Sequence, residues 1–325
     1  MREKVIKAIL DSGENFISGE QLSKQLGISR TAVWKHIKAL KEEGYNIESV
    51  NRKGYRLAEK PNDILSSENI THNLMTECIG KKVIHLDTVG STNDYAKEIG
   101  NKVNGGTLII SEEQTKGKGR LGRTWESVPG EGIWMSLIIK PKIEPYKAPF
   151  LTLVAGASIV VALRKLGVEA SIKWPNDIIV NNKKICGILT ELSAEMERVN
   201  YVVVGPGINV KTLEFPDEIK DKATSLYKEG YRISRVDIVR QFCIEFEKLY
   251  KAYILDGDRK ATIDICREYS PIINKEIYII KNNKKELVKC IDINDNGNLI
   301  IRDRNGEIKE IMSGEISIRG VKGYV

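Results

Sequence analysis

The sequence predicts an α+β protein of several domains: an N-terminal winged helix-turn-helix, a central mixed-sheet α+β domain and a small C-terminal β-barrel. The first part of the chain shows helical hydrophobic spacing followed by a hairpin pattern. Strand and helix patterns then mix through the centre of the chain, and only short strand patterns follow them. We therefore expect domains at residues 1–60, 80–269 and 270–325, with a linker and short helix at 61–79.

Composition narrows the class of protein. The chain has 325 residues, 41% of them hydrophobic and 29% charged, which is typical of a globular protein of two or three domains. Its five cysteines are widely spaced, which argues against a disulfide framework or a zinc site and fits a reducing cytoplasm. The N-terminus alternates charged and aliphatic residues, unlike a signal peptide. The apolar run 150–163 has 14 residues, fewer than the roughly 18 that a bilayer requires, so we expect no membrane association.

The first 60 residues have the pattern of a helix-turn-helix followed by a wing. Ser18 with Gln21 three residues later forms a predicted capping box for a short second helix. Gly27 is expected to end that helix and Ser29 to begin the third. Residues 45–57 then predict two short strands joined by a turn, which completes a winged helix-turn-helix.

Positive charge is concentrated on the third helix and the wing. Residues 29–60 contain eight Lys/Arg and four Asp/Glu, whereas residues 1–28 contain four of each. The net charge of the chain is +7, which permits an anionic partner. Contact with DNA phosphates requires such an asymmetry, and the alternative is a dimerisation or protein-docking module. The predicted DNA-contacting residues are Ser29, Arg30, Thr31, Trp34, Lys35, Lys38, Arg52 and Lys53.

A glycine-rich cationic loop dominates the central domain. Between Lys116 and Arg123, three glycines alternate with four cations. Glycine allows the backbone to approach a ligand, and successive N–H groups beside Lys and Arg can bind phosphate or carboxylate. Such a loop can also close over a bound anion. The alternative is a flexible surface turn.

Short apolar runs predict the remaining elements. Central strands are expected at residues 83–86, 107–112, 132–140, 170–173, 178–180, 183–191 and 201–204, and helices at 67–78, 150–166 and 236–253. A further helix, capped by Ser91 or Thr92, follows the first strand, and its N-terminus suits a carboxylate or another polar group. The last domain has predicted strands at 277–280, 287–293, 299–303, 308–312 and 316–319. Asn296-Gly297 and Asn305-Gly306 are typical hairpin turns.

Four motifs stand in one order in the central domain: Ser91-Thr92-Asn93, Gly117-Lys118-Gly119-Arg120-Leu121-Gly122, Lys173-Trp174-Pro175-Asn176-Asp177 and Lys184-Ile185-Cys186-Gly187-Ile188-Leu189. This order resembles the biotin–protein ligases. With the N-terminal winged helix and the C-terminal β-domain, essentially the whole chain resembles the bifunctional type, which is both biotin ligase and biotin-operon repressor. The resemblance implies a class II synthetase-like ligase domain and an SH3-like C-terminal barrel.

The resemblance also implies a reaction. Biotin and ATP, with Mg²⁺ on the nucleotide, form biotinyl-5′-adenylate, and biotin then passes to a lysine of the carrier domain of a biotin-dependent carboxylase such as acetyl-CoA carboxylase. No protein nucleophile is needed, and no fixed protein metal site is expected. The implied catalytic residues are Lys184, Arg120 and Lys118. The implied biotin and adenylate ligands are Ser91, Thr92, Asn93, Gln114, Lys118, Gly119, Arg120, Trp125, Asn176, Asp177, Lys184, Gly187, Asn209 and Arg319.

Two positions depart from the family pattern. Lys118 stands where arginine is common, which keeps the charge but loses the bidentate guanidinium. Pro206 stands in a segment where an aliphatic residue is expected, and we interpret that segment as a stiffened loop. Packing roles compete for Trp174 and Pro175, and a solvated side chain is the alternative for Lys173. Trp125 could lie in the core, cover adenine or contact a dimer partner.

Other functions share these features. A lipoate or octanoate ligase would have a similar catalytic fold, and a ligand-sensing transcription factor could carry an inactive enzyme domain. The winged helix and the 173–177 motif favour biotin over lipoate, and the intact Lys184 and Arg120 favour an active enzyme. We expect biotinyl-adenylate to act as corepressor, favouring a homodimer that places two winged helices on a two-fold operator.

Overall fold

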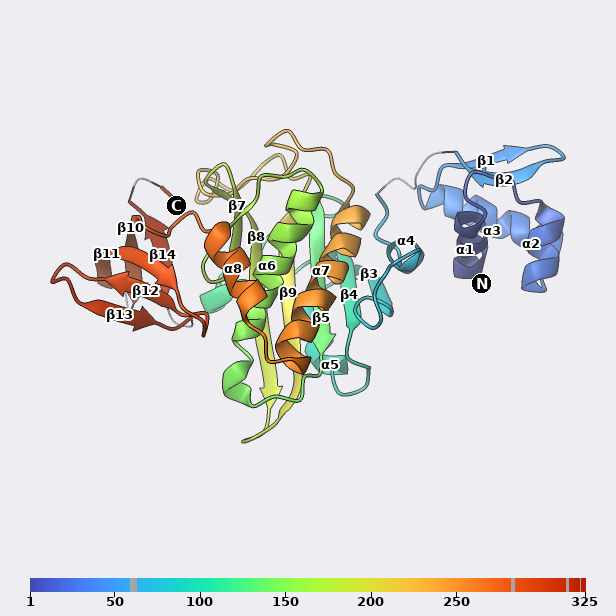
Figure 1. Ribbon diagram of the computed structural model, residues 1–325. Coiled ribbons are helices and arrows are strands. Elements are labelled where there is room, and N and C mark those ends of the chain that lie inside the picture. The colour runs from blue at the N-terminus through green and yellow to red at the C-terminus, as the bar shows by residue number, and fades with distance from the viewer. Residues whose placement is uncertain (59–62, 282–283, 314–315, 322) are drawn as a thin grey trace. The chain divides into compact units, whose positions relative to one another are not determined.

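The computed structural model describes residues 1–58, 63–281, 284–313, 316–321 and 323–325. The chain divides into two compact units, Met1–Leu74 and Met75–Val325 (Figure 1). Residues 61 and 62, at the start of the predicted linker, lie outside the described residues.

The first unit is a winged helix-turn-helix, as predicted. Its elements are α1 (Arg2–Asp11), α2 (Gly19–Leu26), α3 (Arg30–Glu42), β1 (Ile47–Val50), β2 (Gly54–Leu57) and α4 (Ser67–Thr71). The capping box at Ser18 and Gln21 is present, and Gly27 adopts the left-handed conformation, with φ of 66°. The helix predicted at 67–78 is shorter than expected, because it ends at Thr71 and Asn73 turns to a positive φ of 56°.

The second unit is built on a seven-stranded sheet in the order β3-β4-β5-β9-β8-β7-β6. The strands are β3 (Val83–Val89), β4 (Thr107–Gln114), β5 (Gly132–Ile139), β6 (Ser171–Lys173), β7 (Asp177–Val180), β8 (Lys183–Ala194) and β9 (Val199–Asn209). The β3–β4 pair is parallel and the other pairs are antiparallel. The predicted mixed sheet is therefore confirmed.

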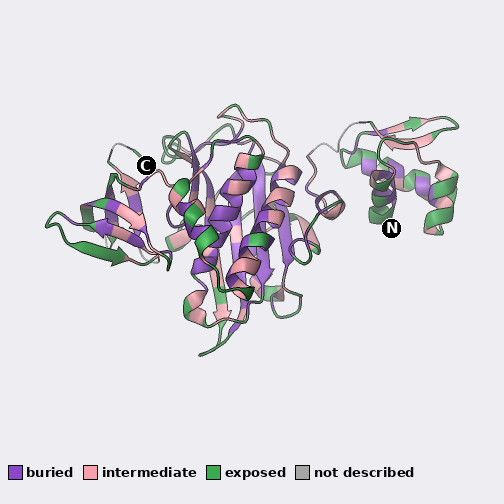
Figure 2. Cartoon of the chain, viewed as in Figure 1, coloured by how far each residue is buried: buried purple, intermediate pink, exposed green. Residues whose placement is uncertain are grey.

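Helices cover the sheet. They are α5 (Thr92–Ile99), α6 (Phe150–Lys165), α7 (Arg235–Leu255) and α8 (Lys260–Glu268), the last of which was not predicted. α5 packs on Tyr201 and Val203 of β9. α6 lies on the opposite face of the sheet, where the hydroxyl of its Thr152 donates a hydrogen bond to the hydroxyl of Thr190 of β8. Figure 2 shows α6 as mostly buried. The stretch Pro145–Lys165 is long and apolar enough to cross a membrane, but 72% of its apolar window is buried within the fold, as in a core helix.

The segment around Pro206 is not a loop, and our prediction there was wrong. It continues β9, where Pro206 lies opposite Ile188 of β8. On the other side, the pairing of β9 with β5 is interrupted between Trp134 and Leu137. Proline lacks an N–H and fits a strand only where no ladder hydrogen bond is needed. Met135, Gly205 and Pro206, which lie at this interruption, line a small cavity.

The C-terminal strands form a five-stranded antiparallel sheet in the order β13-β12-β11-β10-β14. They are β10 (Glu276–Lys281), β11 (Lys284–Ile293), β12 (Leu299–Arg302), β13 (Ile308–Ile311) and β14 (Ser317–Gly320). Gly297 and Gly306 have positive φ in the two turns that the sequence predicted.

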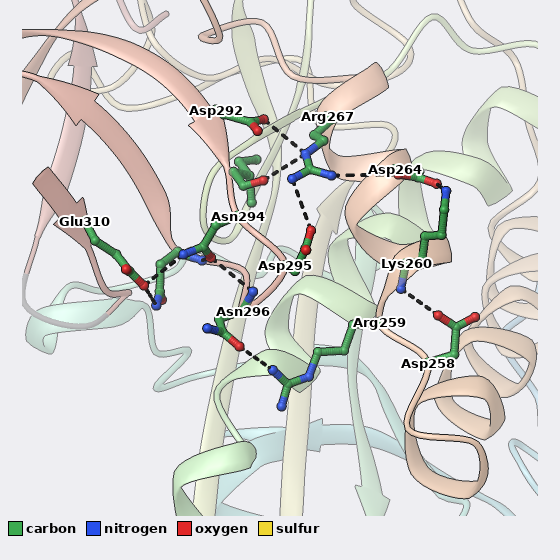
Figure 3. Close-up of polar contacts among 12 residues, drawn as sticks. Asp258, Arg259, Lys260, Asp264, Arg267, Asp292, Asn294, Asp295, Asn296 and Glu310 are labelled. Atoms are coloured by element: carbon green, nitrogen blue, oxygen red, sulfur yellow. Dashed lines mark hydrogen bonds and ion pairs between the residues drawn. The ribbon is translucent and has the colours of Figure 1, made fainter. Parts of the chain in front are cut away.

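Polar contacts join α8 to the turn between β11 and β12 (Figure 3). The guanidinium of Arg267 donates to the carboxylates of Asp292 and Asp295 at 3.0 and 3.3 Å. Arg259 donates to Asn296 at 2.8 Å, and the indole of the buried Trp174 donates to the carbonyl of Gly297 at 2.9 Å. These contacts hold the C-terminal sheet against the central domain.

Candidate active site

Two adjoining cavities lie beside the large sheet. The smaller, of about 40 Å³, is lined by α5, the glycine-rich loop and the middle of β8 and β9. The larger, of about 370 Å³, extends to β14 and the segment after β9. Both are lined by Gly119, Arg120, Trp125, Asn176 and Lys184. These five residues therefore mark the junction of the cavities.

Every predicted biotin or adenylate ligand lines one of the two cavities. The smaller cavity is lined by Ser91, Thr92, Asn93, Gln114, Lys118 and Gly187, in addition to the shared residues. The larger is lined by Asp177, Asn209 and Arg319. Asn209 is buried at the end of β9 and donates to the carbonyl of Thr224 at 3.2 Å. Arg319 lies on β14 and donates to the carbonyl of Ile318 at 2.9 Å.

The N-terminus of α5 supplies a fixed polar wall. Ser91 is the N-cap, and its hydroxyl accepts from the N–H of Asp94. The side-chain oxygen of Gln114 accepts from the N–H and the hydroxyl of Thr92 at 2.8 and 3.0 Å. The amide of Asn93 donates to Glu191 at 2.8 Å, and its oxygen lies 2.5 Å from the hydroxyl of Ser136. Because these groups hold one another in place, the wall is rigid before any ligand binds.

Two paired glycines form the floor beneath Trp125. Gly187 of β8 lies directly opposite Gly207 of β9. A Cβ on Gly207 would lie 2.8 Å from Nε1 of Trp125, and one on Gly187 would lie 2.8 Å from Nζ of Lys184. The half-buried indole of Trp125 therefore rests on bare backbone and is neither a core residue nor fully exposed. Gly205 similarly leaves room for Asn93, whose Oδ1 would be 2.0 Å from an added Cβ.

Gly207→Ala is expected to raise the biotin KM by about tenfold, because the added methyl group displaces Trp125 and narrows the smaller cavity. The matched control is Gly156→Ala in α6, where the nearest atom, on Ile188, lies an ordinary 3.7 Å away. Steady-state kinetics with both variants checks this. A biotin KM that is unchanged for Gly207→Ala contradicts the role of this floor.

The glycine-rich loop is an ordered hairpin. The N–H of Gly119 donates to the carbonyl of Arg123 at 2.7 Å, and that of Trp125 donates to Gly117 at 2.9 Å. Gly122 has a positive φ of 72° and Leu121 one of 58°. Gly117 is required for another reason, since an added Cβ would lie 2.2 Å from the carbonyl oxygen of Trp125. Close backbone approach, more than positive φ, explains this glycine.

The loop cations have different environments. Arg120 is partly buried and donates to Oδ1 of Asn176 at 2.7 Å, which joins the loop to the 173–177 motif. Burial lowers the pKa of Arg120 from its ordinary value. The exposed Lys118 instead forms an ion pair with Asp94 of α5, with Nζ 2.6 Å from the carboxylate. The structure thus directs the Lys118 charge to the rim of the smaller cavity.

Lys184 points to the junction of the cavities. Its Nζ lies 2.6 Å from Oδ1 of Asp177 and 5.2 Å from the centroid of a Trp125 ring. Burial opposes ionisation of Asp177, but the charge of Lys184 and the hydroxyl of Tyr324 hold the pKa of this carboxyl below its usual range. The ammonium is therefore placed where a ligand spanning both cavities must pass.

Lys173 is not solvated, contrary to the sequence-based alternative. Its side chain is 1% exposed and lines the larger cavity. The ammonium donates to the carbonyl of Tyr324 at 2.6 Å and lies 3.3 Å from the centroid of that ring. Burial lowers the pKa of Lys173 to about 7, although Asp177 opposes the shift. Neither Tyr324 nor the buried position of Lys173 was predicted, because both depend on the C-terminal segment folding back onto the catalytic domain.

The predicted DNA-contacting residues are all exposed, and four of them line one concave surface of the first unit. Ser29, Arg30, Thr31, Trp34, Lys35, Lys38, Arg52 and Lys53 are all exposed. Trp34 is 55% exposed, which is unusual for so large an apolar side chain. A concave surface runs between α3 and the wing and is lined by Arg30, Thr31, Trp34 and Arg52.

Comparison with known proteins identifies the family. The biotin/lipoate A/B protein ligase family matches residues 86–209, an HTH domain matches 2–56, and the biotin protein ligase C-terminal domain matches 272–319. The chain is 42% identical to the bifunctional ligase/repressor BirA of Bacillus spizizenii, over 98% of both chains. The chain belongs to the bifunctional ligase/repressor family of biotin–protein ligases. BirA of Escherichia coli is 31% identical, over 97% of this chain and 96% of that one.

Solved structures of the family agree. The biotin protein ligase from Aquifex aeolicus in complex with biotin and ATP is 33% identical and superposes with a TM-score of 0.65. The match covers 74% of this chain and 99% of the Aquifex chain. The family membership explains the three parts of the chain, because members of the bifunctional type combine a ligase with a repressor.

Proposed function

We infer that this protein is an ATP-dependent biotin–protein ligase that also binds DNA as a transcriptional repressor. Biotin and ATP form biotinyl-5′-adenylate and diphosphate, and biotin is then transferred to a lysine of a carrier domain. The single observation that carries the ligase activity is the junction between the two cavities, where Lys184 and Arg120 meet the smaller and the larger space.

The junction suits the chemistry of adenylation. A carboxylate must attack the α-phosphate, so two anions approach each other. The bond between the α-phosphorus and the bridging oxygen then breaks, and diphosphate leaves with that oxygen. Cations aimed at this point offset the repulsion and stabilise the charge that develops in the transition state. The smaller cavity, with its fixed hydroxyl and amide groups, suits the polar ring system of biotin. The larger, with Phe215 and Ile219 in its lining, suits the nucleotide.

We propose that Mg²⁺ binds to the protein together with the nucleotide. Among the described residues, no group of three or more His, Cys, Asp and Glu side chains is arranged to hold a metal. Mg²⁺ is commonly bound through phosphates, waters and one or two carboxylates. Two carboxylate residues, Glu126 and Asp177, line the larger cavity, and the ion would add positive charge at the phosphates.

The acceptor is proposed to be a biotin carboxyl carrier domain, with that of acetyl-CoA carboxylase as the first candidate. A relative from Mycobacterium tuberculosis, 29% identical over 65% of this chain, is named a biotin–[acetyl-CoA-carboxylase] ligase. The acceptor lysine attacks the mixed anhydride and releases AMP. A loop that covers the adenylate protects it from water until the acceptor arrives.

Diphosphate–ATP exchange with biotin, lipoate and octanoate tests the ligase proposal. Exchange with biotin alone is expected, because the site belongs to a biotin ligase. Exchange with lipoate or octanoate instead would assign the chain to the other branch of the family. Absence of exchange with all three acids would favour a sensor without ligase activity.

The DNA-binding role predicts a specific salt dependence. Lys35→Ala should weaken DNA binding for specific and non-specific sequences alike, and should lower the slope of log K against log salt by about 0.9 for one lost phosphate contact. Lys7→Ala on the exposed side of α1 is the matched control. Fluorescence anisotropy at several salt concentrations measures both slopes. Equal slopes for wild type and Lys35→Ala would remove this residue from the DNA-contacting surface.

Regulation is proposed to couple the two roles. Biotinyl-adenylate would act as corepressor by favouring a homodimer, which places two winged helices on a two-fold operator. Equal operator affinity with and without adenylate in a gel shift would rule out this coupling. We also propose a cytoplasmic location for the protein and domain limits at residues 1–60, 61–79, 80–269 and 270–325.

A further inference from the structure

Tyr324 belongs to none of the four motifs that carry the resemblance to the family. It lies beyond residues 272–319, which match the C-terminal domain of the family, and it lines the larger cavity. The residue is 8% exposed. A segment of the C-terminal domain therefore contributes a buried tyrosine to the site where the nucleotide is proposed to bind.

Tyr324 is linked to Lys184 through one carboxylate. Its hydroxyl donates to Oδ2 of Asp177, while Oδ1 of the same carboxylate lies 2.6 Å from Nζ of Lys184. The side chain of Asp177 is 14% exposed and that of Lys184 is 24% exposed. Oδ2 accepts a hydrogen bond from the tyrosine and Oδ1 faces the lysine in an ion pair, so both oxygens of the carboxylate are engaged.

A second contact fixes the Tyr324 segment itself. The buried ammonium of Lys173 donates to the backbone carbonyl of Tyr324 and lies against the face of its ring. Cations positioned this way over an aromatic face are attracted by it. Lys173 pairs with Asp177 across the β6–β7 hairpin, so the same hairpin holds both the backbone and the hydroxyl of the tyrosine.

We propose that Tyr324 is a positioning residue for Lys184, acting through the Asp177 carboxylate, and that Lys173 anchors it. The inference rests on the proposed ligase activity. By occupying Oδ2, the tyrosine hydroxyl prevents the carboxylate from turning toward Lys184 with both oxygens. The lysine is then held by one oxygen only, with its ammonium directed to the junction of the cavities. The C-terminal domain thereby has a defined part in adenylate formation.

Removal of the hydroxyl should impair the chemical step more than binding. In Tyr324→Phe the ring still packs against Lys173, but Oδ2 of Asp177 loses its donor and the carboxylate can turn toward Lys184. We expect the maximal rate of diphosphate–ATP exchange to fall about tenfold, with the biotin KM within about twofold of wild type. Tyr231→Phe is the matched control, because its hydroxyl accepts a hydrogen bond from the N–H of Glu169 outside both cavities.

A double-mutant cycle identifies the route of the effect. If Tyr324 acts through Asp177, then Tyr324→Phe should have little further effect in an Asp177→Asn background. Additive losses, or an unchanged rate in Tyr324→Phe, would overturn the proposal. If exchange by Asp177→Asn is too slow to measure, the same cycle is completed with the affinity for biotinyl-adenylate, measured by calorimetry, and additive losses again overturn it.

Two controls separate this inference from simpler explanations. Thermal unfolding shows whether Tyr324→Phe acts only by loosening the C-terminal segment. If the exchange rate of Tyr324→Phe recovers fully at a lower temperature at which the variant is folded, Tyr324 is not a positioning residue. Diphosphate–ATP exchange with biotin is also measured for the wild type. No exchange by the wild type would contradict the ligase proposal, whereas normal exchange by both the wild type and Tyr324→Phe would contradict only the role of Tyr324.

Discussion

Lys184→Ala is expected to slow adenylate formation by about 10²–10³-fold, which is typical for loss of one preorganised charge that stabilises a transition state. The ammonium is held at the junction of the two cavities by Asp177 and lies beside Trp125. In its absence, the positive charge of Lys184 no longer offsets the repulsion between the biotin carboxylate and the α-phosphate. Single-turnover formation of biotinyl-adenylate at saturating ATP measures the effect.

Lys183→Ala is the control for this prediction. It removes the same kind of side chain from the preceding position of β8, where alternation directs it to the other face, and Lys183 lines neither cavity. Its adenylation rate should stay within about twofold of wild type. Similar losses in both variants would mean that general charge, and not the position of Lys184, matters.

Stability must be followed in the same experiment. Lys184→Ala removes the ion-pair partner of the largely buried Asp177 carboxylate, which by itself destabilises the fold. Lys184→Ala combined with Asp177→Asn removes both charges. If the double variant regains thermal stability while adenylation stays slow, local unfolding does not explain the kinetic loss.

Arg120→Gly is the second large effect, and it should appear as leakage of the intermediate. The guanidinium joins the loop to Asn176 through a hydrogen bond of 2.7 Å, and charge-assisted bonds of this kind are among the stronger ones. Without it, the loop loses a contact that holds it over the junction. We expect release of free biotinyl-adenylate to accelerate by about tenfold or more, with biotinylation of non-cognate lysines.

The control for loop flexibility is Leu121→Gly. Leu121 is 60% exposed and has a positive φ, so glycine at this position relieves strain without removing a charge. Adenylate release measured by filtration of the radiolabelled intermediate should stay near the wild-type rate in Leu121→Gly. If Arg120→Gly retains the adenylate as tightly as wild type, the loop does not act as a lid.

Much of this molecule follows from local sequence. The capping box at Ser18 and Gln21, the left-handed Gly27 and the hairpin turns at Gly297 and Gly306 were all predicted, because the conformation of each depends on its immediate neighbours. The mixed type of the central sheet was predicted from its apolar runs. The order of four short motifs was enough to indicate the family. Local periodicity failed at α8 and Pro206, where packing and strand pairing decide the conformation.

The sequence by itself indicated the fold class, the order of the domains and fourteen of the residues that line the two cavities. Only the tertiary structure decided how they are connected. Gly187 and Gly207 become a floor because two strands pair in one register, and no local pattern sets that register. Lys173 is buried because Tyr324, 151 residues along the chain, returns to cover it and to bind Asp177. Contacts between segments so distant in sequence are set by the packing of whole domains, which no single stretch of residues encodes.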